Sequence, residues 1–307
     1  MSENWTVNKI PDLTGKIIVI TGANSGIGFE TAREIARKGA EVIVASRNPI
    51  KAERAIHTIM DEILGAKLKY IELDLASLES IKAFSRQFNS TYDRLDILLN
   101  NAGIMLVPYG KTADGFERTM GTNHLGHFAL TGLLLDKLSK TPGARVVNVA
   151  SNAHYAGEMD FNNLLFDNGQ GYSPMKAYGR SKLANLLFTY ELQRRFLSSS
   201  TDVIALAAHP GIAATELANH LFFNLISWLI QPIMKLIFQS SAMGALPSLR
   251  AALDPQAKGG QYYGPNGKGE KSGYPVLVDS NSSSKNEKDA QKLWEISEEL
   301  TGIKYLN

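Results

Sequence analysis

Short apolar runs rich in β-branched residues recur along the chain and predict strands that are buried on both faces. Between them, small and apolar residues are spaced by three or four positions, as in the segment that begins at Gly28 and continues through Ala32 and Ile35. This spacing places them on one face of a helix. Alternating strands and helices predict an α/β fold, a doubly wound parallel sheet with helices on both faces. The predicted strands are residues 16–21, 41–45, 68–73, 95–99, 145–149 and 203–207.

Both ends of the chain differ from this pattern. Residues 1–13 form a polar N-terminal arm, and residues 14–307 are predicted to form a single domain. The stretch 259–267 and the polar residues 281–284 are typical of loops. A last helix is expected near residues 285–302, ending at Gly302.

Composition excludes several classes of function. The 307 residues are 44% hydrophobic and 20% charged, as in soluble globular proteins. A net charge of +2 argues against a nucleic-acid partner. The absence of cysteine excludes disulfides, thiolate zinc sites and cysteine nucleophiles. The N-terminus lacks a basic segment followed by an apolar run, so the expected location is the cytoplasm.

The first chemical signal is the glycine-rich turn Thr21–Gly28, which follows the first strand and opens the first helix. Backbone amides and the helix dipole at such a position bind a pyrophosphate. Arg47 follows Gly28 by nineteen residues, where NAD enzymes usually carry an acid. A guanidinium there pairs with a 2′-phosphate, so NADP(H) is predicted over NAD(H). A solvated arginine at a strand end is the alternative.

Two further positions have more than one interpretation. Asp74 is expected either to accept from the adenine amino group or to cap the helix that begins near Ser77. His124 and His127 lie three residues apart without a nearby acidic ligand, so we expect helix packing and no metal site.

A second chemical signal lies on the helix predicted to start at Ser173 and Pro174. Tyr178 and Lys182 are one turn apart and share a face. A buried ammonium near a phenol is expected to lower the tyrosine pKa and make the phenol a usable acid or base. Such a pair alone is common, so its weight depends on the rest of the sequence.

The order of motifs along the chain resembles that of the short-chain dehydrogenase/reductase family, whose fold is Rossmann-like. The resemblance covers about residues 14–250 and is strongest to the branch of retinol dehydrogenases and protochlorophyllide reductases and to its bacterial relatives. Residues 111–116 and 123–128 and the Leu293-Trp294 tail are similar to that branch. The motifs that carry the resemblance are the glycine turn, Asn100-Asn101-Ala102-Gly103, Asn123, Ser151, Tyr178-x-x-x-Lys182 and Pro210-Gly211.

The resemblance implies a role for each matching residue. Tyr178 would exchange a proton with the substrate oxygen while hydride passes to or from the nicotinamide, and Lys182 would hold the ribose and lower the tyrosine pKa. Ser151 would bind the reacting oxygen, and Asn123 would anchor a water in the proton relay. The cofactor would contact Gly22, Asn24, Ser25, Gly26, Ile27, Gly28, Ser46, Arg47, Asp74, Leu75, Asn100, Ala102, Gly103, Tyr178, Lys182, Pro210, Gly211, Ile212 and Thr215.

The sequence departs from the family pattern at two places. Ser25 stands where many NADP-dependent relatives carry a second basic residue, which leaves Arg47 to set the preference largely alone. The interval from Ser151 to Tyr178 is 27 residues, longer than in compact members, which predicts an enlarged rim around the site.

The most apolar stretch, residues 221–238, is predicted to belong to a substrate lid near 215–240. A plain buried helix and peripheral membrane contact are the alternatives. The predicted activity is hydride transfer between NADP(H) and a small lipophilic aldehyde or ketone, or the matching alcohol. A catalytically silent NADP(H)-binding redox sensor is the other hypothesis, and both a homodimer and a monomer remain open.

Overall fold

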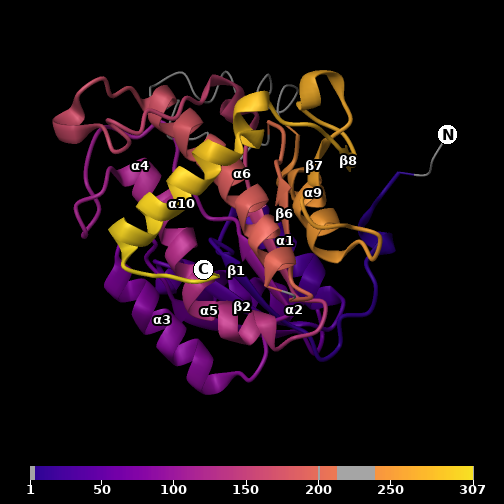
Figure 1. Cartoon of the computed structure of the whole chain (residues 1–307). Coiled ribbons are helices and arrows are strands. Elements are labelled where there is room, and N and C mark those ends of the chain that lie inside the picture. Colours follow the sequence, from indigo (N-terminus) through magenta and orange to yellow (C-terminus); the bar gives the residue numbers. More distant parts are fainter. Residues whose placement is uncertain (1–3, 200, 213–238, 307) are drawn as a thin grey trace, which may run out of the picture.

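One eight-stranded sheet forms the centre of the molecule, with the strand order β3-β2-β1-β4-β5-β6-β7-β8 (Figure 1). The computed structural model describes residues 4–199, 201–212 and 239–306. The strands are β1 (Ile17–Thr21), β2 (Glu41–Ser46), β3 (Lys67–Glu72), β4 (Ile97–Asn100), β5 (Arg145–Val149), β6 (Ile204–Ala208), β7 (Tyr262–Pro265) and β8 (Pro275–Leu277).

The sheet is parallel from β3 to β7, and β8 pairs antiparallel with β7. The chain order reverses between β1 and β4, because β2 and β3 lie on one side of β1 and the later strands on the other. In open α/β sheets, ligands bind beyond the carboxyl ends of the strands at such a reversal. The doubly wound α/β prediction is confirmed.

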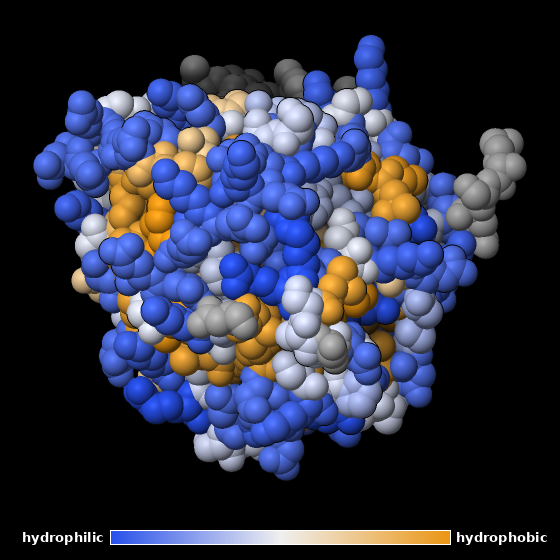
Figure 2. Space-filling view, in the orientation of Figure 1, coloured by the Kyte–Doolittle hydropathy of each residue, from blue (hydrophilic) through white to orange (hydrophobic). Residues whose placement is uncertain are grey.

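Helices cover both faces of the sheet (Figure 1). Buried residues of α1, α2 and α9 share one apolar cluster, and those of α3, α5 and α6 share another. α10 packs on α6, and the surface in this view is mostly hydrophilic, with separate apolar patches (Figure 2). The helices are α1 (Gly26–Arg37), α2 (Pro49–Glu62), α3 (Leu78–Thr91), α4 (Arg118–Met120), α5 (Gly126–Ser139), α6 (Pro174–Ser198), α9 (Ser241–Leu253) and α10 (Glu287–Thr301).

The prediction of a loop over residues 259–267 was wrong, because β7 occupies 262–265. Tyr262 and Tyr263 are each only 2% exposed and pair with Ala207 and Ala208 of β6. Glycine and proline nearby indicated turns, but burial of two aromatic rings against β6 decides the conformation. The stretch 281–284, also predicted as loop, overlaps the 3₁₀ helix η6 (Ser282–Lys285).

The two ends of the chain pack against the domain. In the N-terminal arm, Trp5, Ile10 and Leu13 are buried in the core beside α1 and α2, so the arm is less polar in its contacts than its composition indicates. In α10, Leu293 and Trp294 are buried. No helix within the described ranges is both long and apolar enough to cross a membrane.

Candidate active site

The glycine-rich turn lies at the carboxyl end of β1, where α1 begins. Gly22 has a φ of +69°, and a Cβ on it would lie 3.1 Å from atoms of Ala102. A Cβ on Gly28 would lie 2.3 Å from the Gly22 carbonyl oxygen. Ser25 is the N-cap of α1, but its side chain makes no capping hydrogen bond. The first N–H groups of α1 are therefore available to an anion, and Gly22, Asn24, Ser25, Gly26 and Ile27 are all partly exposed there.

The hydroxyl of Thr21 ties this turn to the segment after β4. Its oxygen accepts from the backbone N–H groups of Asn101 and Ala102, both at 2.9 Å. The Asn101 side-chain amide donates to the Thr21 carbonyl oxygen at 2.8 Å. Asn100, by contrast, turns its side chain into the core, where it donates to Asn148 at 2.8 Å. Asn100 can thus meet a nucleotide only through its backbone.

Arg47 and Ser46 lie at the carboxyl end of β2, beside the turn. Arg47 is exposed, and its guanidinium forms no ion pair with an acidic residue of the described ranges. Ser46 is 6% exposed, and no hydrogen-bond partner for its hydroxyl lies among those residues. An unpaired guanidinium at this edge is available to a phosphate.

Asp74 and Leu75 follow β3. The Asp74 carboxylate accepts from the Ala76 N–H at 3.0 Å, whereas Ser77 caps α3 by accepting from the Ser80 N–H. The alternative that Asp74 caps this helix is therefore wrong. Asp74 stays partly exposed and Leu75 is buried.

Ser151, Tyr178 and Lys182 converge at the carboxyl end of β5. Ser151 follows that strand closely, and the other two project from the first turns of α6, which Ser173 caps by accepting from the Lys176 N–H at 3.2 Å. The Ser151 hydroxyl lies close enough to Tyr178 to lower the pKa of its phenol. The Lys182 ammonium lies 5.7 Å from the Tyr178 ring centroid and donates to the Val149 carbonyl oxygen at 2.9 Å. A partly exposed phenol thus sits beside a hydroxyl and a buried cation.

Asn123 joins this group from a π-helical turn, η2 (Gly121–Leu125), that lies between α4 and α5. Protein groups use both amide hydrogens of its side chain, which donates to the Ile104 carbonyl oxygen and the Ser181 hydroxyl, and its Oδ1 accepts from the Ile104 N–H, all within 2.9 Å. A Cβ on Gly103 would lie 3.3 Å from Asn123 Oδ1 and 3.5 Å from Lys182 Nζ. Gly103 therefore lies between these two side chains and leaves the space beside them open.

The electrostatics differ from the sequence-based prediction. Burial raises the pKa of the Tyr178 phenol above its ordinary value, and the hydrogen bond with Ser151 opposes this only in part. Burial lowers the pKa of Lys182 to about 8. The predicted lowering of the Tyr178 pKa by Lys182 is not found in this structure, because burial of the phenol is the dominant influence on that pKa.

His127 connects the nucleotide turn to the π-helical turn. With both lone pairs of the Thr21 hydroxyl oxygen used by N–H groups, its hydrogen points to His127 Nε2, 2.9 Å away. His127 Nδ1 must then carry the ring proton, which it donates to the Asn123 carbonyl oxygen at 3.0 Å. Burial lowers the pKa of His127 to about 4, so the ring is neutral. His124 is also buried and bonds to Ser297, and within the described part of the chain no metal-binding group of three or more His, Asp or Glu residues occurs.

The segment Pro210–Ile212 follows β6 at the same edge of the sheet. Gly211 has a φ of +66°, and a Cβ on it would lie 2.5 Å from the Lys271 carbonyl oxygen. All three residues are partly exposed. Thr215 and nearly all of the predicted lid at 215–240 lie outside the described residues, as does the stretch 221–238.

The long interval between Ser151 and Tyr178 folds over the start of α6 and is held there by Arg180. The guanidinium donates to three carbonyl oxygens of the interval, at distances of 2.7 to 3.0 Å, and lies 4.1 Å from the Phe166 ring centroid. Arg180 is 5% exposed. One buried cation thus fixes the irregular rim beside the phenol; the three oxygens belong to Glu158, Asn163 and Leu164.

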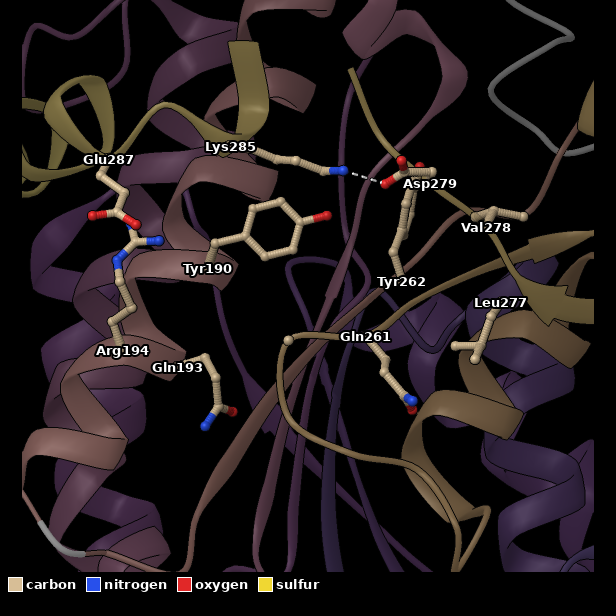
Figure 3. Close-up of a pocket in the computed structure, with 11 residues that line it drawn as sticks. Tyr190, Gln193, Arg194, Gln261, Tyr262, Leu277, Val278, Asp279, Lys285 and Glu287 are labelled. Atoms are coloured by element: carbon tan, nitrogen blue, oxygen red, sulfur yellow. Dashed lines mark ion pairs between the residues drawn. The ribbon is translucent and has the colours of Figure 1, made fainter. Parts of the chain in front are cut away.

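A separate cavity of about 520 Å³ lies between α6, the start of β7 and the segment from β8 to α10 (Figure 3). Tyr190, Gln193 and Arg194 line it from α6, and Lys285 bridges to Asp279 at 2.5 Å. Tyr190 is more than three helical turns from Tyr178. None of the residues that line this cavity is a predicted site residue.

The residues present fit a nicotinamide dinucleotide. The turn has no room for side chains at Gly22 and Gly28, which lets a pyrophosphate approach the free N–H groups of α1. Arg47 offers a cation for a 2′-phosphate. Among the residues that the structure describes, the Lys182 ammonium has one acceptor for its three hydrogens, so the other two are available to ribose hydroxyls.

Sequence reasoning missed several residues that support this site. His154 donates to the Ser151 carbonyl oxygen at 2.7 Å and accepts from the Asn281 N–H. His209 directly precedes Pro210 and pairs with Glu270. His209 was detectable through its place before Pro210-Gly211, whereas nothing local marks Asn281 or Glu270.

A family model, curated relatives and solved structures all match most of this chain and agree with one another. A family model described as short chain dehydrogenase matches residues 16–224. Retinol dehydrogenase 12 of Mus musculus is 42% identical over 296 residues, covering 95% of this chain and 88% of the relative. The crystal structure of an uncharacterised protein from Mycobacterium paratuberculosis is 40% identical, with a TM-score of 0.82 and 99% coverage of both chains. A short chain dehydrogenase from Shigella flexneri, complexed with NADP, is 25% identical, with a TM-score of 0.62 and coverage of 82% of this chain and 97% of that one.

Proposed function

Because the chain belongs to the short-chain dehydrogenase family and is therefore an oxidoreductase, we propose that it transfers hydride between NADP(H) and a lipophilic carbonyl compound or its alcohol. The observation that carries this proposal is the meeting of Ser151, Tyr178 and Lys182 beside Gly103, at the edge where the glycine turn opens. A hydroxyl, a phenol and an ammonium at one point suit proton exchange with a substrate oxygen.

In the reducing direction, Tyr178 donates its proton to the carbonyl oxygen while Ser151 holds that oxygen by a hydrogen bond. Reduced nicotinamide, when bound, supplies the hydride that the substrate carbon takes up. The raised pKa keeps the phenol protonated at neutral pH, which suits an acid. The Ser151 hydroxyl, which lowers the pKa of the phenol, then stabilises the phenolate. Lys182 is cationic below its pKa of about 8 and would hold the ribose hydroxyls.

In the oxidising direction, the same phenol must first lose its proton. Alcohol oxidation is therefore expected to rise with pH as Tyr178 ionises, and carbonyl reduction is expected to stay constant around neutrality and to fall in that alkaline range. The order of the two pH profiles follows from the raised pKa of Tyr178.

The preference for NADP(H) rests on Arg47. The relative from Shigella flexneri was solved with NADP, which agrees with the guanidinium at this edge of the sheet. We predict that Arg47→Asp inverts the order of the two cofactors, as measured by kcat/KM with NADPH and NADH. Arg54→Asp, a matched change at an exposed arginine of α2, leaves that order unchanged. An unaltered ratio in Arg47→Asp would refute this assignment.

The lipophilic substrate class rests on the apolar rim and on the relatives. Met175 is 52% exposed one turn before Tyr178, and Tyr155 is 57% exposed just after Ser151. The segment 104–107 is apolar, partly exposed and fastened to Asn123 and to the Tyr172 hydroxyl. Retinol dehydrogenase 12, by its name, acts on a lipophilic alcohol.

The test is consumption of NADPH by the purified chain over aldehydes and ketones of increasing chain length. We expect turnover whose kcat/KM rises with chain length, and slower turnover with NADH. Tight NADPH binding without turnover across the whole panel would favour the silent redox sensor instead. Absence of NADPH binding would overturn the proposal as a whole.

A further inference from the structure

A loop beyond the region that the family model matches reaches into the proposed site. Residues 266–273, here called the clasp loop, join β7 to β8 at one edge of the sheet (Figure 1). The family model ends at residue 224. The clasp loop nevertheless contacts the segment after β6 and the residue that follows Ser151.

The strongest contact of the clasp loop is made by Glu270 with His209. Glu270 Oε2 lies 2.8 Å from His209 Nε2, and His209 is fully buried. The Gly211 N–H, which can only donate, bonds to His209 Nδ1 at 3.2 Å. The ring proton is therefore on Nε2 and is donated to the Glu270 carboxylate. His209 thus links Glu270 to the backbone of Gly211.

Local geometry indicates that this pair is a built feature. A Cβ on Gly264 of β7 would lie 2.0 Å from His209 Nε2, so the glycine makes room for the imidazole. The ring also packs on Tyr262, at 5.2 Å between centroids. Glu270 has a φ of +54°, a left-handed conformation that is costly for a residue with a side chain. The chain keeps a strained backbone at the residue that reaches His209.

The clasp loop is also fastened at three other points around the site. The Lys271 carbonyl oxygen accepts from the Ile212 N–H at 2.8 Å, and the Gly269 carbonyl oxygen accepts from the Asn152 side chain at 3.3 Å. Gln239 accepts from the Gly273 N–H at 3.2 Å and donates its backbone N–H to the Ile212 carbonyl oxygen at 3.0 Å. These bonds fix both flanks of Gly211 to one loop.

We propose that the clasp loop, through the Glu270–His209 pair, positions Pro210, Gly211 and Ile212 against the nicotinamide ring and so sets the geometry of hydride transfer. This inference rests on the proposed function, in which those three residues line the nicotinamide. Glu270 and His209 are positioning residues, because they act through the backbone of Gly211. The pyrophosphate and the 2′-phosphate would bind at the other strands of the edge, so nucleotide affinity is largely independent of the pair.

The experiment compares Glu270→Ala, Glu270→Gly and Glu270→Gln in the full chain, with Lys268→Ala as a control at an exposed residue of the same loop. We expect kcat to fall by about tenfold or more in the alanine and glycine variants, since small misplacements of reacting groups are costly. The NADPH dissociation constant should change by less than about threefold. Glutamine retains an acceptor for His209 Nε2, so Glu270→Gln should recover most of the activity.

The glycine variant separates positioning from stability. Alanine and glycine both remove the partner of the buried His209, but only glycine adopts a positive φ without strain, so Glu270→Gly should unfold at a higher temperature than Glu270→Ala, although both turn over equally slowly. The primary isotope effect with 4-deuterated NADPH should increase in this variant, because hydride transfer becomes slower relative to the other steps. A purely structural role predicts activity that follows thermal stability.

The outcomes distinguish the two proposals. A wild-type chain that neither binds nor consumes NADPH would overturn the proposed function itself. If the wild type turns over but Glu270→Ala and Glu270→Gly keep kcat within about twofold, the positioning role is wrong. The same holds if kcat and NADPH affinity fall together, or if Glu270→Gly restores full turnover.

Discussion

The nucleotide side and the substrate side of the site are held together by different kinds of group. The nucleotide side, residues 21–28, 100–103 and 123–127, is tied by backbone amides, the Thr21 hydroxyl and the neutral His127. The substrate side, residues 151–173, 209–212 and 266–273, is tied by the charged groups of Arg180 and Glu270. The short turns at strand ends are held by neutral hydrogen bonds, whereas the irregular loops are held by charged side chains, one of which, Arg180, is buried.

This difference predicts how each side fails. The substrate side depends on single charged side chains, and Arg180 alone serves three carbonyl oxygens, so one substitution there should have a large effect. The nucleotide side depends on histidines that are neutral when buried, so acid should weaken it. Stability measurements can therefore separate the two sides.

The largest effect is expected for Arg180→Met, which keeps the length of the side chain but removes its donors. Three backbone carbonyl oxygens lose their charged partner, and the stacking on Phe166 is weakened. We expect the free energy of unfolding to fall by about 4 kcal/mol, measured by urea denaturation. Arg86→Met, at an exposed arginine paired with the exposed Glu79, should cost less than about 1 kcal/mol. Equal losses in the two variants would contradict this account of the rim.

An intermediate effect is expected on acidification. Burial lowers the pKa of His124 to about 3 and that of His127 to about 4, from 6.5 in both cases. The unfolded chain therefore binds more protons than the folded one below pH 6.5, and stability falls as pH decreases from there toward the folded pKa values. Together the two rings should contribute about 2–3 kcal/mol per pH unit between pH 6.5 and about pH 4.5. Burial also lowers the pKa of His154, which acts in the same direction.

Denaturation by urea at a series of pH values checks this slope. Carboxylates whose pKa is lowered, such as Glu41, lose their contribution only at pH values below the ordinary glutamate pKa of 4.5. Above that value the slope reports mainly the histidines, and Glu30, whose pKa burial raises, acts in the opposite direction. A flat stability profile from pH 6.5 to about pH 4.5 would show that the two rings are not buried as neutral groups.

The smallest effect is expected for His127→Gln at neutral pH. Glutamine carries one acceptor for the Thr21 hydroxyl and donors for the Asn123 carbonyl oxygen, so the loss should be about 1 kcal/mol. The acid slope should nevertheless fall by about a third to a half, because one of the buried rings that produce it is gone. His57→Gln, at an exposed histidine, should change neither quantity. An unchanged acid slope in His127→Gln would exclude His127 as its source.

The difference between the nucleotide side and the substrate side also explains which features the sequence could predict. Glycine spacing in the Thr21–Gly28 turn, the Ser173-Pro174 helix start and the one-turn spacing of Tyr178 and Lys182 are local signals, and the elements appear where they predict them. β7 was missed because two tyrosines in a glycine-rich stretch become a strand only through pairing with β6. The pKa of Tyr178 was predicted in the wrong direction because burial of the phenol raises it, and the spacing of residues along a helix does not encode burial.

The supports of the substrate side were beyond local reasoning for a related reason. Glu270 and His209 are 61 residues apart in sequence, and Asn281 and His154 are 127 apart. Their pairing depends on where β7 and β8 join the sheet. Motifs identify groups that lie in one turn, and the folded sheet determines which distant residues hold those groups in place.

The most direct test of the central claim is turnover of a lipophilic aldehyde with NADPH by Tyr178→Phe, with Tyr190→Phe as the matched control. Tyr190 lies on the same helix, but its hydroxyl bonds to Ser280 away from Ser151. We predict that Tyr178→Phe lowers kcat by about a thousandfold with an NADPH dissociation constant within about threefold of the wild type, and that Tyr190→Phe keeps its turnover. Turnover by Tyr178→Phe above about one tenth of the wild-type rate would contradict the assignment of this phenol as the proton donor.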